Sequence, residues 1–388
     1  MRLTALAAHT PEAVRAALAA RGWDDAPARF AAVGVQSLTL LLEDVTPDER
    51  EAFVAWGARA GADVLTGEGW ALVAAAASRL APLARPDRVP PGLAGVSPEL
   101  ARFLASHAEP PRCWRIRDGE ITLDHPVLIG ILNVTPDAFS DGGRYTTAND
   151  ALRHAERLKA DGCELIDVGG ESTRPGAGGV AADDEIRRVA PAIEALVRGG
   201  LGPVSIDTRK AAVARAALAA GAVVVNDVSG FTADAALAGV AAAAGAGAVV
   251  MHMRGTPDTM DGLATYRHVA VDVAAELAAA ARAVEAAGVA REGIVVDPGF
   301  GFAKTAAQNL RLLDELATIV GLGYPVAVGP SRKRFLGFAT GRPVEDRDRA
   351  TATACALAYE RGARLFRVHD VALAREALAV ATATSEPT

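Results

Sequence analysis

The chain has 388 residues, of which 51 % are hydrophobic and 22 % charged, and its net charge is −7. This composition is typical of a folded globular protein and argues against nucleic acid as the main partner, because phosphate binding usually shows as a basic surplus. None of the three cysteines stands in a C-x-x-C pair, so neither a zinc site nor a disulfide framework is indicated and a reducing cytoplasm is expected. We expect no signal peptide and no membrane span.

The first 124 residues are rich in alanine and carry few clusters of polar side chains. An apolar run within Ser37–Glu49, a helical segment and a second run in Gly61–Gly67 predict a small β-α-β unit with flanking helices. A turn at Arg117–Glu120 between two short apolar runs predicts a hairpin near the boundary. We therefore expect a small α/β N-terminal domain over residues 1–124 whose default role is packing or assembly, with regulation possible.

Residues 125–388 alternate between short β-branched runs and longer Ala/Leu/Glu/Arg runs typical of helices. Eight apolar runs are predicted as strands: Val127–Val134, Leu165–Val168, Val204–Asp207, Val223–Asp227, Ala248–His252, Ile294–Asp297, Val326–Gly329 and Leu365–Val368. Helical runs between them include Asn149–Ala160, Asp183–Val197, Ala211–Ala220, His268–Ala287 and Ala306–Thr318. Strands separated by helices pair in parallel, and eight such units favour a (β/α)8 TIM barrel over an open doubly wound sheet.

Polar residues stand at the carboxyl ends of nearly all these strands, where a barrel builds its active site. They are Asn133, Asp167, Asp207, Asn226, Asp227, His252, Asp297, Ser331, Lys333, Arg367 and His369. Aspartate is a poor strand residue, so its repeated presence there requires a reason. Structural pairing could explain one or two of these residues, but function is the better explanation for the set.

Two kinds of side chain in this set indicate different ligand chemistry. Asp207, Asn226 and Asp297 together suit a flat heterocycle with amidine-like N–H groups and a lactam, although each alone could be a satisfied core residue. The loops after strands seven and eight often hold phosphate in barrels, and Arg367 could bind an oxyanion with two N–H groups. His369 beside it favours anion contact, whereas His252 could be structural or functional.

The remaining basic and loop residues allow more than one interpretation. For Arg332, Lys333 and Arg334 we expect one or two to be solvated surface charges. The glycine- and proline-rich segments Thr135–Gly143 and Gly169–Gly179 predict mobile lids at the catalytic face.

These motifs together resemble those of the dihydropteroate synthase family, and the resemblance covers nearly all of residues 125–380. The matching segments begin at Ile131 (ILNVTPDAFSDGG), Asp167 (DVGGESTRPG), Ser205 (SIDTRK), Asn226 (NDVSG), Met251 (MHMRGTP), Asp297 (DPGFGFAK), Gly329 (GPSRKR) and Arg367 (RVHD). Eight motifs in order make the resemblance specific, although any one alone would be weak. The N-terminal region resembles an extension carried by some members.

The resemblance implies a transferase that condenses 6-hydroxymethyl-7,8-dihydropterin diphosphate with 4-aminobenzoate to give 7,8-dihydropteroate and diphosphate in folate biosynthesis. Catalytic roles are implied for Asp207, Asp297, Lys333 and Arg367. Substrate binding is implied for these four and for Asn226, Met251, Gly329 and His369. The aminobenzoate side is implied for Thr173, Arg174, Pro175, Phe302 and Ser331. Asn133 is implied as the protein ligand of a Mg²⁺ ion, and family members are usually homodimers.

Two rival functions remain at this point. A methyltetrahydrofolate-corrinoid methyltransferase shares the strand-end Asp and Asn residues but needs neither the phosphate-side clusters nor the Thr173–Pro175 loop. A non-catalytic pterin-binding paralogue should lack Arg367 or Lys333, which are both present. One departure from the family is Ala303, which stands where many members have glycine. We expect no loss of function from this difference.

Overall fold

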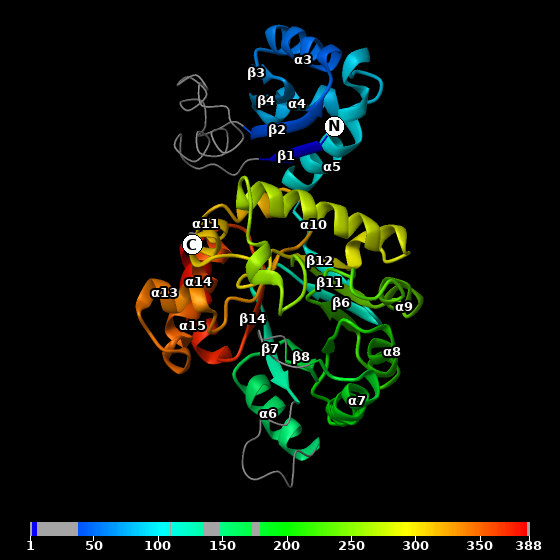
Figure 1. Cartoon of the computed structure of the whole chain (residues 1–388), viewed down its shortest axis with the longest axis vertical. Coiled ribbons are helices and arrows are strands. Elements are labelled where there is room, and N and C mark those ends of the chain that lie inside the picture. Colours follow the sequence, from blue (N-terminus) through cyan, green and yellow to red (C-terminus); the bar gives the residue numbers. More distant parts are fainter. Residues whose placement is uncertain (1, 6–37, 109, 135–147, 173–178, 386–388) are drawn as a thin grey trace. The chain divides into compact units, whose positions relative to one another are not determined.

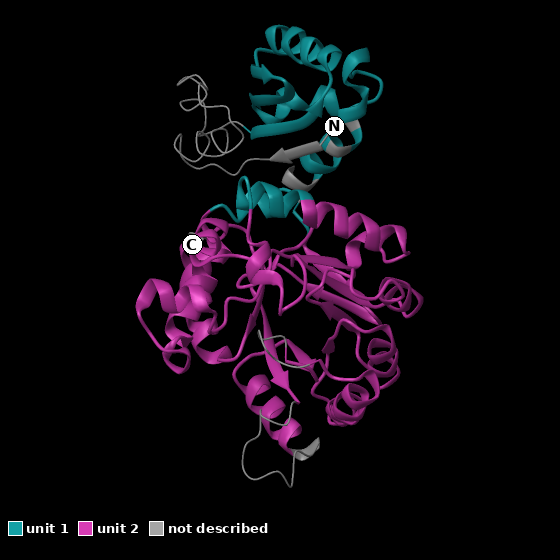
Figure 2. Ribbon diagram, viewed as in Figure 1, with its two compact units in different colours: residues 1–111, 266–275, 315–323 teal, residues 112–265, 276–314, 324–388 magenta. Residues whose placement is uncertain are grey.

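A computed structural model describes residues 2–5, 38–108, 110–134, 148–172 and 179–385 (Figure 1). The chain divides into two compact units (Figure 2). Unit 1 comprises Met1–Pro111, Tyr266–Ala275 and Glu315–Gly323, and unit 2 comprises the rest of the chain. Within the described ranges no helix is both long and apolar enough to cross a membrane.

The N-terminal part of unit 1 contains a four-stranded antiparallel sheet in the order β1-β2-β4-β3. Its strands are β1 (Arg2–Ala5), β2 (Leu38–Val45), β3 (Asp63–Gly67) and β4 (Gly69–Ala75). Helix α3 (Pro47–Ala60) connects β2 to β3, and the helices that follow β4 are α4 (Ala77–Leu80), η1 (Ala81–Ala84), η2 (Pro91–Val96) and α5 (Ser97–Ala108). The predicted β-α-β unit is present, but β4 lies between its two strands.

Local sequence signals fix the ends of α3. Thr46 caps the helix, since its hydroxyl accepts from Glu49 N while the Glu49 carboxylate accepts from Thr46 N at 2.8 Å. Such a reciprocal capping box satisfies two otherwise unpaired N–H groups of the first turn. Gly61 ends the helix at φ 63°, a left-handed conformation that glycine adopts without strain. The buried Phe53 and Trp56 of α3 belong to one core with residues of β2 and β4.

Unit 2 is built on eight parallel strands in the order β12-β11-β10-β9-β8-β7-β14-β13. They are β7 (Val127–Asn133), β8 (Leu165–Gly169), β9 (Val204–Asp207), β10 (Val224–Asp227), β11 (Gly247–Met251), β12 (Ile294–Asp297), β13 (Ala327–Val328) and β14 (Leu365–Val368). A parallel bridge between Val296 and Val326 links β12 to the segment before β13 and closes the cylinder. The predicted (β/α)8 barrel is confirmed, with all eight strands within two residues of the predicted bounds at each end.

Helices connect successive strands. They are α6 (Ala148–Ala160), α7 (Ala182–Arg198), α8 (Ala211–Ala219), α9 (Leu237–Ala243), η4 (Met260–Leu263), α10 (Val269–Ala286), η5 (Arg291–Gly293), α11 (Ala306–Asp314), α12 (Ala317–Val320), α13 (Arg334–Thr340), η6 (Val344–Asp346), α14 (Asp348–Glu360) and α15 (Val371–Ser385). The helix predicted over Ala306–Thr318 is two helices, α11 and α12, and the other four predicted helices agree within two residues at each end.

A hairpin closes the amino-terminal end of the barrel. Strands β5 (Cys113–Ile116) and β6 (Gly119–Thr122) pair across the predicted turn, and the fully buried Trp114 donates from its indole N–H to Gly293 O at 2.9 Å. Trp114 and the inward side chains of the barrel strands form one apolar cluster. Because this hairpin belongs to the barrel core, the compact unit that holds the barrel starts at Arg112 rather than at residue 125.

Candidate active site

The strand register brings three of the predicted polar side chains, those of Asn133, Asp207 and Asn226, to one level of the barrel. Asn133 pairs with Gly169, and Gly169 in turn pairs with Asp207. On the other side Asp207 pairs with Asn226, and Met251 pairs with Asp297. These residues come from six consecutive strands, β7 to β12. We use the term strand-end site for seven residues: Asn133, Asp167, Asp207, Asn226, Asp297, Lys333 and Arg367.

Asp167 connects several residues of the strand-end site through hydrogen bonds. Its side chain is fully buried and accepts hydrogen bonds from the Ser205 hydroxyl, from Asn226 Nδ2 at 3.0 Å and from Arg367 Nε at 2.6 Å. A buried carboxylate is tolerated only when its oxygens are paired in this way. The sequence placed Asp167 at a strand end but assigned it no role, and no spacing rule indicates contacts with residues up to 200 positions away.

Arg367 joins two of the carboxylates. Besides Asp167 it contacts Asp207, whose Oδ2 accepts from Nη2 at 2.8 Å. Burial raises the pKa of Asp207, the positive charge of Arg367 opposes this rise, and the negative charge of Asp167 adds to it. Arg367 Nη1 makes no hydrogen bond to any described residue. The guanidinium is thus held by two carboxylates and keeps one N–H edge for an anion.

Asp297 lies across the site at the end of β12. Its Oδ1 accepts from Gly299 N at 2.7 Å, and the residue is only 6 % exposed. Burial raises the pKa of Asp297 to about 6, although the Gly299 N–H and the positive charges of Lys333, Lys304 and Arg367 oppose the rise. Gly329 borders this carboxylate, since a Cβ atom at its position would make an ordinary van der Waals contact of 3.9 Å with Asp297 Oδ2.

Three acceptor oxygens of the site remain without a partner among the described residues. In Asp207, Asn226 and Asp297 one polar atom of the side chain is fixed by a protein hydrogen bond. Asp207 Oδ1, Asn226 Oδ1 and Asp297 Oδ2 make no hydrogen bond in that part of the chain and are not fully sealed from solvent. Oriented acceptors of this kind suit a ligand with several N–H donors.

An apolar cluster forms the wall beside these oxygens. Met251 and Phe302 are buried in contact with Val228, Met260 and Ala303. Lys333 Nζ lies 4.1 Å from the centre of the Phe302 ring, a cation–π arrangement that holds the ammonium at the edge of the site. The combination of an apolar wall and a few oriented polar groups is usual for a small-molecule site.

Ser331 and His369 pair beside Arg367. The Ser331 hydroxyl oxygen accepts from His369 N at 3.2 Å and lies 2.8 Å from His369 Nδ1. If the hydroxyl donates to Nδ1, the ring proton stands on Nε2, so that the ring can donate to an anion. The structure therefore places Ser331 against His369, and its expected contact with aminobenzoate stays a prediction.

The two arginines beside Lys333 point to other partners. Arg332 makes two hydrogen bonds to Asp348, from Nε at 2.8 Å and from Nη2 at 2.7 Å. Arg334 is largely exposed and pairs with Asp261 at 2.9 Å. Of these three residues, Arg334 fits the expectation of a solvated surface charge, Arg332 is bound to Asp348, and Lys333 reaches the strand-end site.

Two further strand-end residues are structural. Asp227 accepts from Ser229 N, Ser229 Oγ and Phe231 N, each at 2.7 Å, and so shapes the turn after β10. His252 lies between Glu276 and Lys304, with Nε2 2.9 Å from Glu276 Oε2.

The described ends of the second loop are tied together by Glu171. Its Oε1 accepts from Val180 N at 3.2 Å, so one carboxylate joins both sides of the loop. Arg209 and Lys210, which follow β9, pair with the same carboxylate. Thr173, Arg174 and Pro175, implied for aminobenzoate, lie outside the described residues, as does the first loop from Thr135 to Gly143.

Asn133 has the properties required of a single protein ligand for Mg²⁺. Its side chain is partly exposed and makes no hydrogen bond to a described residue, and its Oδ1 faces Gly169, where a Cβ would lie only 3.3 Å away. Mg²⁺ prefers oxygen ligands and keeps several waters. The described residues contain no group of three or more His, Cys, Asp or Glu side chains arranged for a metal.

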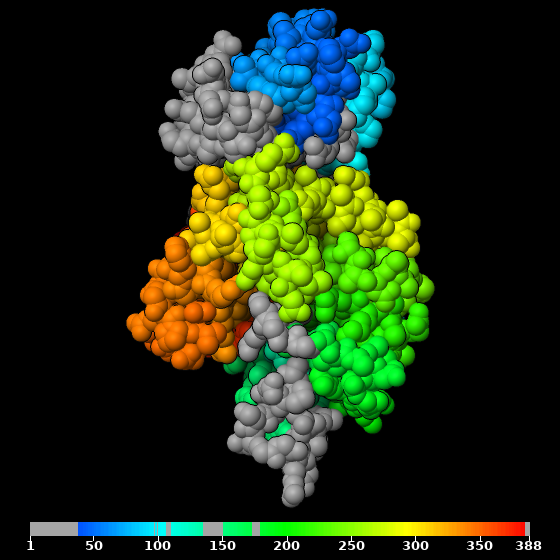
Figure 3. All heavy atoms as spheres, viewed as in Figure 1, coloured from blue at the N-terminus to red at the C-terminus, as the bar shows by residue number. Residues whose placement is uncertain are grey.

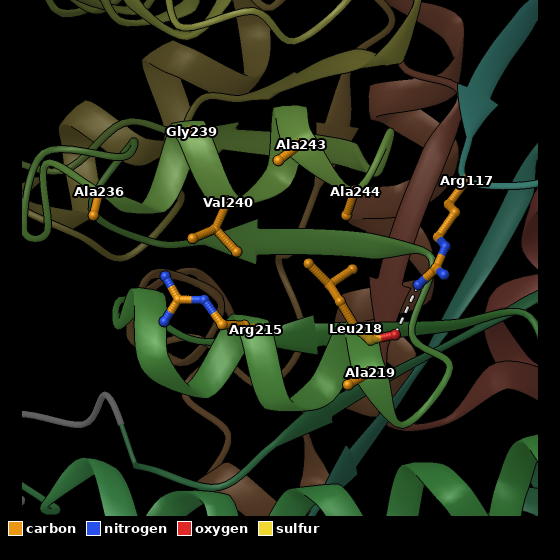
Figure 4. Close-up of a pocket in the computed structure, with 9 residues that line it drawn as sticks. All are labelled: Arg117, Arg215, Leu218, Ala219, Ala236, Gly239, Val240, Ala243 and Ala244. Carbon is orange, nitrogen blue, oxygen red and sulfur yellow. Dashed lines mark hydrogen bonds between the residues drawn. The ribbon is translucent and has the colours of Figure 1, made fainter.

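A separate surface groove lies between α8 and α9 (Figure 4). It has a volume of about 560 Å³ and is lined mainly by alanine, leucine and valine, with Arg215 and Arg117 beside it. Arg117 donates to Leu218 O at 2.7 Å, and its backbone N–H bonds Val223 O just before β10. The groove is therefore near the amino-terminal end of the barrel and contains none of the predicted site residues.

Comparison with known proteins identifies the family. Residues 129–369 match the family model described as "Pterin binding enzyme". The chain belongs to the pterin-binding enzymes.

Among the relatives of this pterin-binding enzyme are dihydropteroate synthases from several bacteria. The Streptococcus pyogenes serotype M6 protein is 46 % identical over 255 residues, which are 65 % of this chain and 93 % of that protein. The Xanthomonas albilineans dihydropteroate synthase with 4-aminobenzoic acid is 44 % identical at a TM-score of 0.66, covering 69 % of this chain and 96 % of that one. The same enzyme in complex with 7,8-dihydropteroate is 41 % identical at a TM-score of 0.63, with 69 % and 97 % covered.

These matches confirm that this pterin-binding enzyme is a transferase of the dihydropteroate synthase family. The family model matches residues within the barrel. The individual residue roles and the Mg²⁺ ligand stay predictions.

Proposed function

We propose that the chain condenses 6-hydroxymethyl-7,8-dihydropterin diphosphate with 4-aminobenzoate to form 7,8-dihydropteroate and diphosphate at the strand-end site. The observation that carries this proposal is the set of three oriented acceptor oxygens, on Asp207, Asn226 and Asp297, beside an apolar wall and the anion-facing edge of Arg367. One side of the site thus suits the pterin ring and the other suits its diphosphate.

The pterin ring is recognised by complementary hydrogen bonding. Its amino group and ring N–H groups donate to the open oxygens of Asp207, Asn226 and Asp297, while the Lys333 ammonium donates to its carbonyl or a ring nitrogen. Met251, a buried side chain of the apolar wall, covers one face of the ring. Phe302 of the same wall lies on the side proposed for the aminobenzoate. A site built from buried acceptors rejects a ring without matching donors, since unpaired polar groups are costly.

The diphosphate leaves towards Arg367 and His369. The C–O bond between the pterin methylene and the diphosphate breaks, and both electrons depart with the diphosphate oxygen. Arg367 Nη1 and the Nε2–H of His369 donate to the developing negative charge, an electrostatic stabilisation of the leaving group. The Asp167 and Asp207 carboxylates keep the guanidinium in place during this step.

The methylene carbon then carries positive charge that is delocalised into the pterin ring. Asp297 stabilises this cation as a carboxylate, which its pKa of about 6 permits at neutral pH. The lone pair of the aminobenzoate nitrogen forms the new C–N bond, and that nitrogen loses one proton to solvent or to the diphosphate. The sum is one C–O bond broken, one C–N bond formed and one proton released.

Asn133 would hold a Mg²⁺ ion through its amide oxygen, an oxygen ligand of the kind that this ion prefers. When bound, the ion supplies Lewis-acid stabilisation of the diphosphate charge.

A direct assay tests the proposed reaction. The purified chain is incubated with both substrates and Mg²⁺, and 7,8-dihydropteroate and diphosphate are measured together. Formation of both in equal amounts, dependent on 4-aminobenzoate, is expected. Absence of dihydropteroate at any enzyme concentration would refute the proposal, and methyl transfer from methyltetrahydrofolate would support the corrinoid alternative instead.

We also propose that the chain forms a homodimer in the cytoplasm. Support for the dimer comes from exposed apolar side chains on neighbouring carboxyl-terminal elements: Phe338 on α13, Val344 on η6, Leu357 on α14 and Val380 on α15. The segment of α13 and η6, orange in the space-filling view, lies on the outer surface of unit 2 (Figure 3). A dimer mass in light scattering that falls to a monomer in Phe338→Asp would support this face, and a monomeric wild-type chain would refute it.

A further inference from the structure

Outside the strand-end site, the side chain of Lys304 is a buried ammonium group whose contacts are all to protein atoms. The residue is 6 % exposed, and its Nζ contacts His252 Nδ1 at 2.9 Å, Phe302 O at 3.0 Å and Gly299 O at 3.1 Å. Three acceptors match the three N–H donors of an ammonium. Burying a charge is costly unless it is fully paired. Burial lowers the pKa of Lys304 to about 7, although the charges of Asp297 and Glu276 oppose the fall, so the ammonium is charged over the acid limb of activity. A lysine placed here therefore requires a reason other than packing.

The ammonium holds the loop that follows β12. It bonds the carbonyl of Gly299, the residue whose N–H bonds Asp297 Oδ1 at 2.7 Å. It also bonds the carbonyl of Phe302, whose ring lies under the Lys333 ammonium. One buried charge therefore fixes the two backbone positions on which the orientation of Asp297 and Lys333 depends.

The same loop contains a strained residue and a second anchor. Ala303, between Phe302 and Lys304, has φ 49°, a left-handed conformation unfavourable for alanine. The buried Asn309 accepts from Gly301 N at 2.7 Å and donates to Lys304 O at 3.2 Å. Strain of this kind persists only where surrounding contacts enforce it, and the bonds of Lys304 and Asn309 are those contacts.

Lys304 is itself held by a chain of charged groups from β11 and α10. Because His252 Nδ1 accepts from the ammonium, the ring proton stands on Nε2, which donates to Glu276 Oε2 at 2.9 Å. Arg254 Nε donates to the same oxygen at 3.1 Å. Burial lowers the pKa of His252 to about 4, so the ring is neutral at physiological pH. We call Lys304, His252, Glu276 and Arg254 the Lys304 network.

The network also brings a positive charge towards Asp297. The charged groups that face Asp297 are Lys304 on its own loop, Lys333 after β13 and Arg367 on β14, and each lowers its pKa against the effect of burial. His252, after β11, is neutral and donates its backbone N–H to Asp297 O at 2.9 Å. Loss of the Lys304 charge should therefore raise the pKa of Asp297 further.

We propose that Lys304 is a positioning residue for the condensation: its ammonium holds the loop after β12 so that Asp297 and Lys333 face the pterin, and the rest of the Lys304 network holds the ammonium. The proposal rests on the proposed function. Lys304 does not touch substrate, and it acts through the Gly299 and Phe302 carbonyls.

The test is the pH profile of dihydropteroate formation by Lys304→Met, compared with wild type and with Lys159→Met. Lys159 lies on α6 and donates to Glu164 O, far along the chain from this loop, so its variant should match wild type. For Lys304→Met we expect kcat to fall by about 10- to 100-fold, as misplacement of catalytic groups does. The acid limb should also move upward by about 0.5 to 1 pH unit, as loss of a nearby positive charge requires.

A purely structural role would lower the yield or the melting temperature but leave kcat per folded molecule and the acid limb unchanged, and that result would overturn the proposal. If Lys304→Met does not fold, Glu276→Gln carries the test, because the Glu276 side chain is 41 % exposed. It should lower kcat by about three- to tenfold, as weakening a charged hydrogen bond does. A Glu276→Gln variant with the kcat of wild type and the same acid limb would overturn the proposal. Failure of the proposed function would be distinguishable, because the wild-type chain would then form no product.

Discussion

Replacing Asp297 with asparagine should abolish most activity while stabilising the fold. Asparagine keeps an Oδ1 that can accept from Gly299 N, so the turn after β12 is retained. It removes the negative charge that stabilises the pterin cation, and loss of one oriented electrostatic group typically lowers kcat by about 10²- to 10³-fold.

The stability gain follows from the pKa of Asp297. Burial raises it from 3.8 to about 6, a difference of about 2 pH units, and each unit corresponds to about 1.4 kcal/mol. Ionising this carboxyl in the folded protein therefore costs on the order of 3 kcal/mol at pH 8. Because the folded pKa lies above the unfolded one, the cost is present in full above about pH 6, shrinks as the pH falls towards 4 and vanishes below that.

Two measurements check this prediction. Steady-state turnover of Asp297→Asn at pH 8 should be lower by the stated factor, and its melting temperature should exceed that of wild type at pH 8 but match it at pH 4. The wild-type kcat should itself fall on the acid side with an apparent pKa near 6. A variant with wild-type turnover, or one less stable than wild type at pH 8, would refute the reasoning.

Three further predictions concern other parts of the site. Arg367→Met leaves the Asp167 and Asp207 carboxylates without their counter-charge, so the free energy of unfolding in urea should drop by about 3 kcal/mol or more; an unchanged value would contradict the assigned pairing. Asn133→Ala should weaken activation by Mg²⁺ by about tenfold at unchanged melting temperature, and an unaltered Mg²⁺ titration would remove Asn133 as its ligand. Ala303→Gly removes the steric strain of an alanine at φ 49°, so the free energy of unfolding should rise by up to about 1 kcal/mol. A lower melting temperature in this variant would show that Ala303 is not strained.

The regular parts of the barrel could be predicted from sequence because they follow from local pattern. Short β-branched runs between alanine-rich helices predicted the eight strands, and each aspartate or asparagine at a strand end marked the catalytic face. The register then brought Asn133, Asp207 and Asn226 to one level, as parallel strands of a closed barrel require.

Other features depend on contacts between distant positions or on backbone conformation. Asp167 and Arg367 stand 200 residues apart, so their ion pair leaves no trace in local spacing. Strand β4 is rich in alanine, a helix-favouring residue, and it becomes a strand because β2 and β3 pair with its two edges. No loss was expected from Ala303, but its left-handed conformation is visible only once the loop after β12 is built.

A crystal structure of the chain with 6-hydroxymethyl-7,8-dihydropterin diphosphate and Mg²⁺ tests the central claim most directly. The account predicts the pterin ring against the open oxygens of Asp207, Asn226 and Asp297, with the diphosphate at Arg367 and His369. Density for the ligand in the groove between α8 and α9, or a pterin ring turned away from these three oxygens, would contradict it.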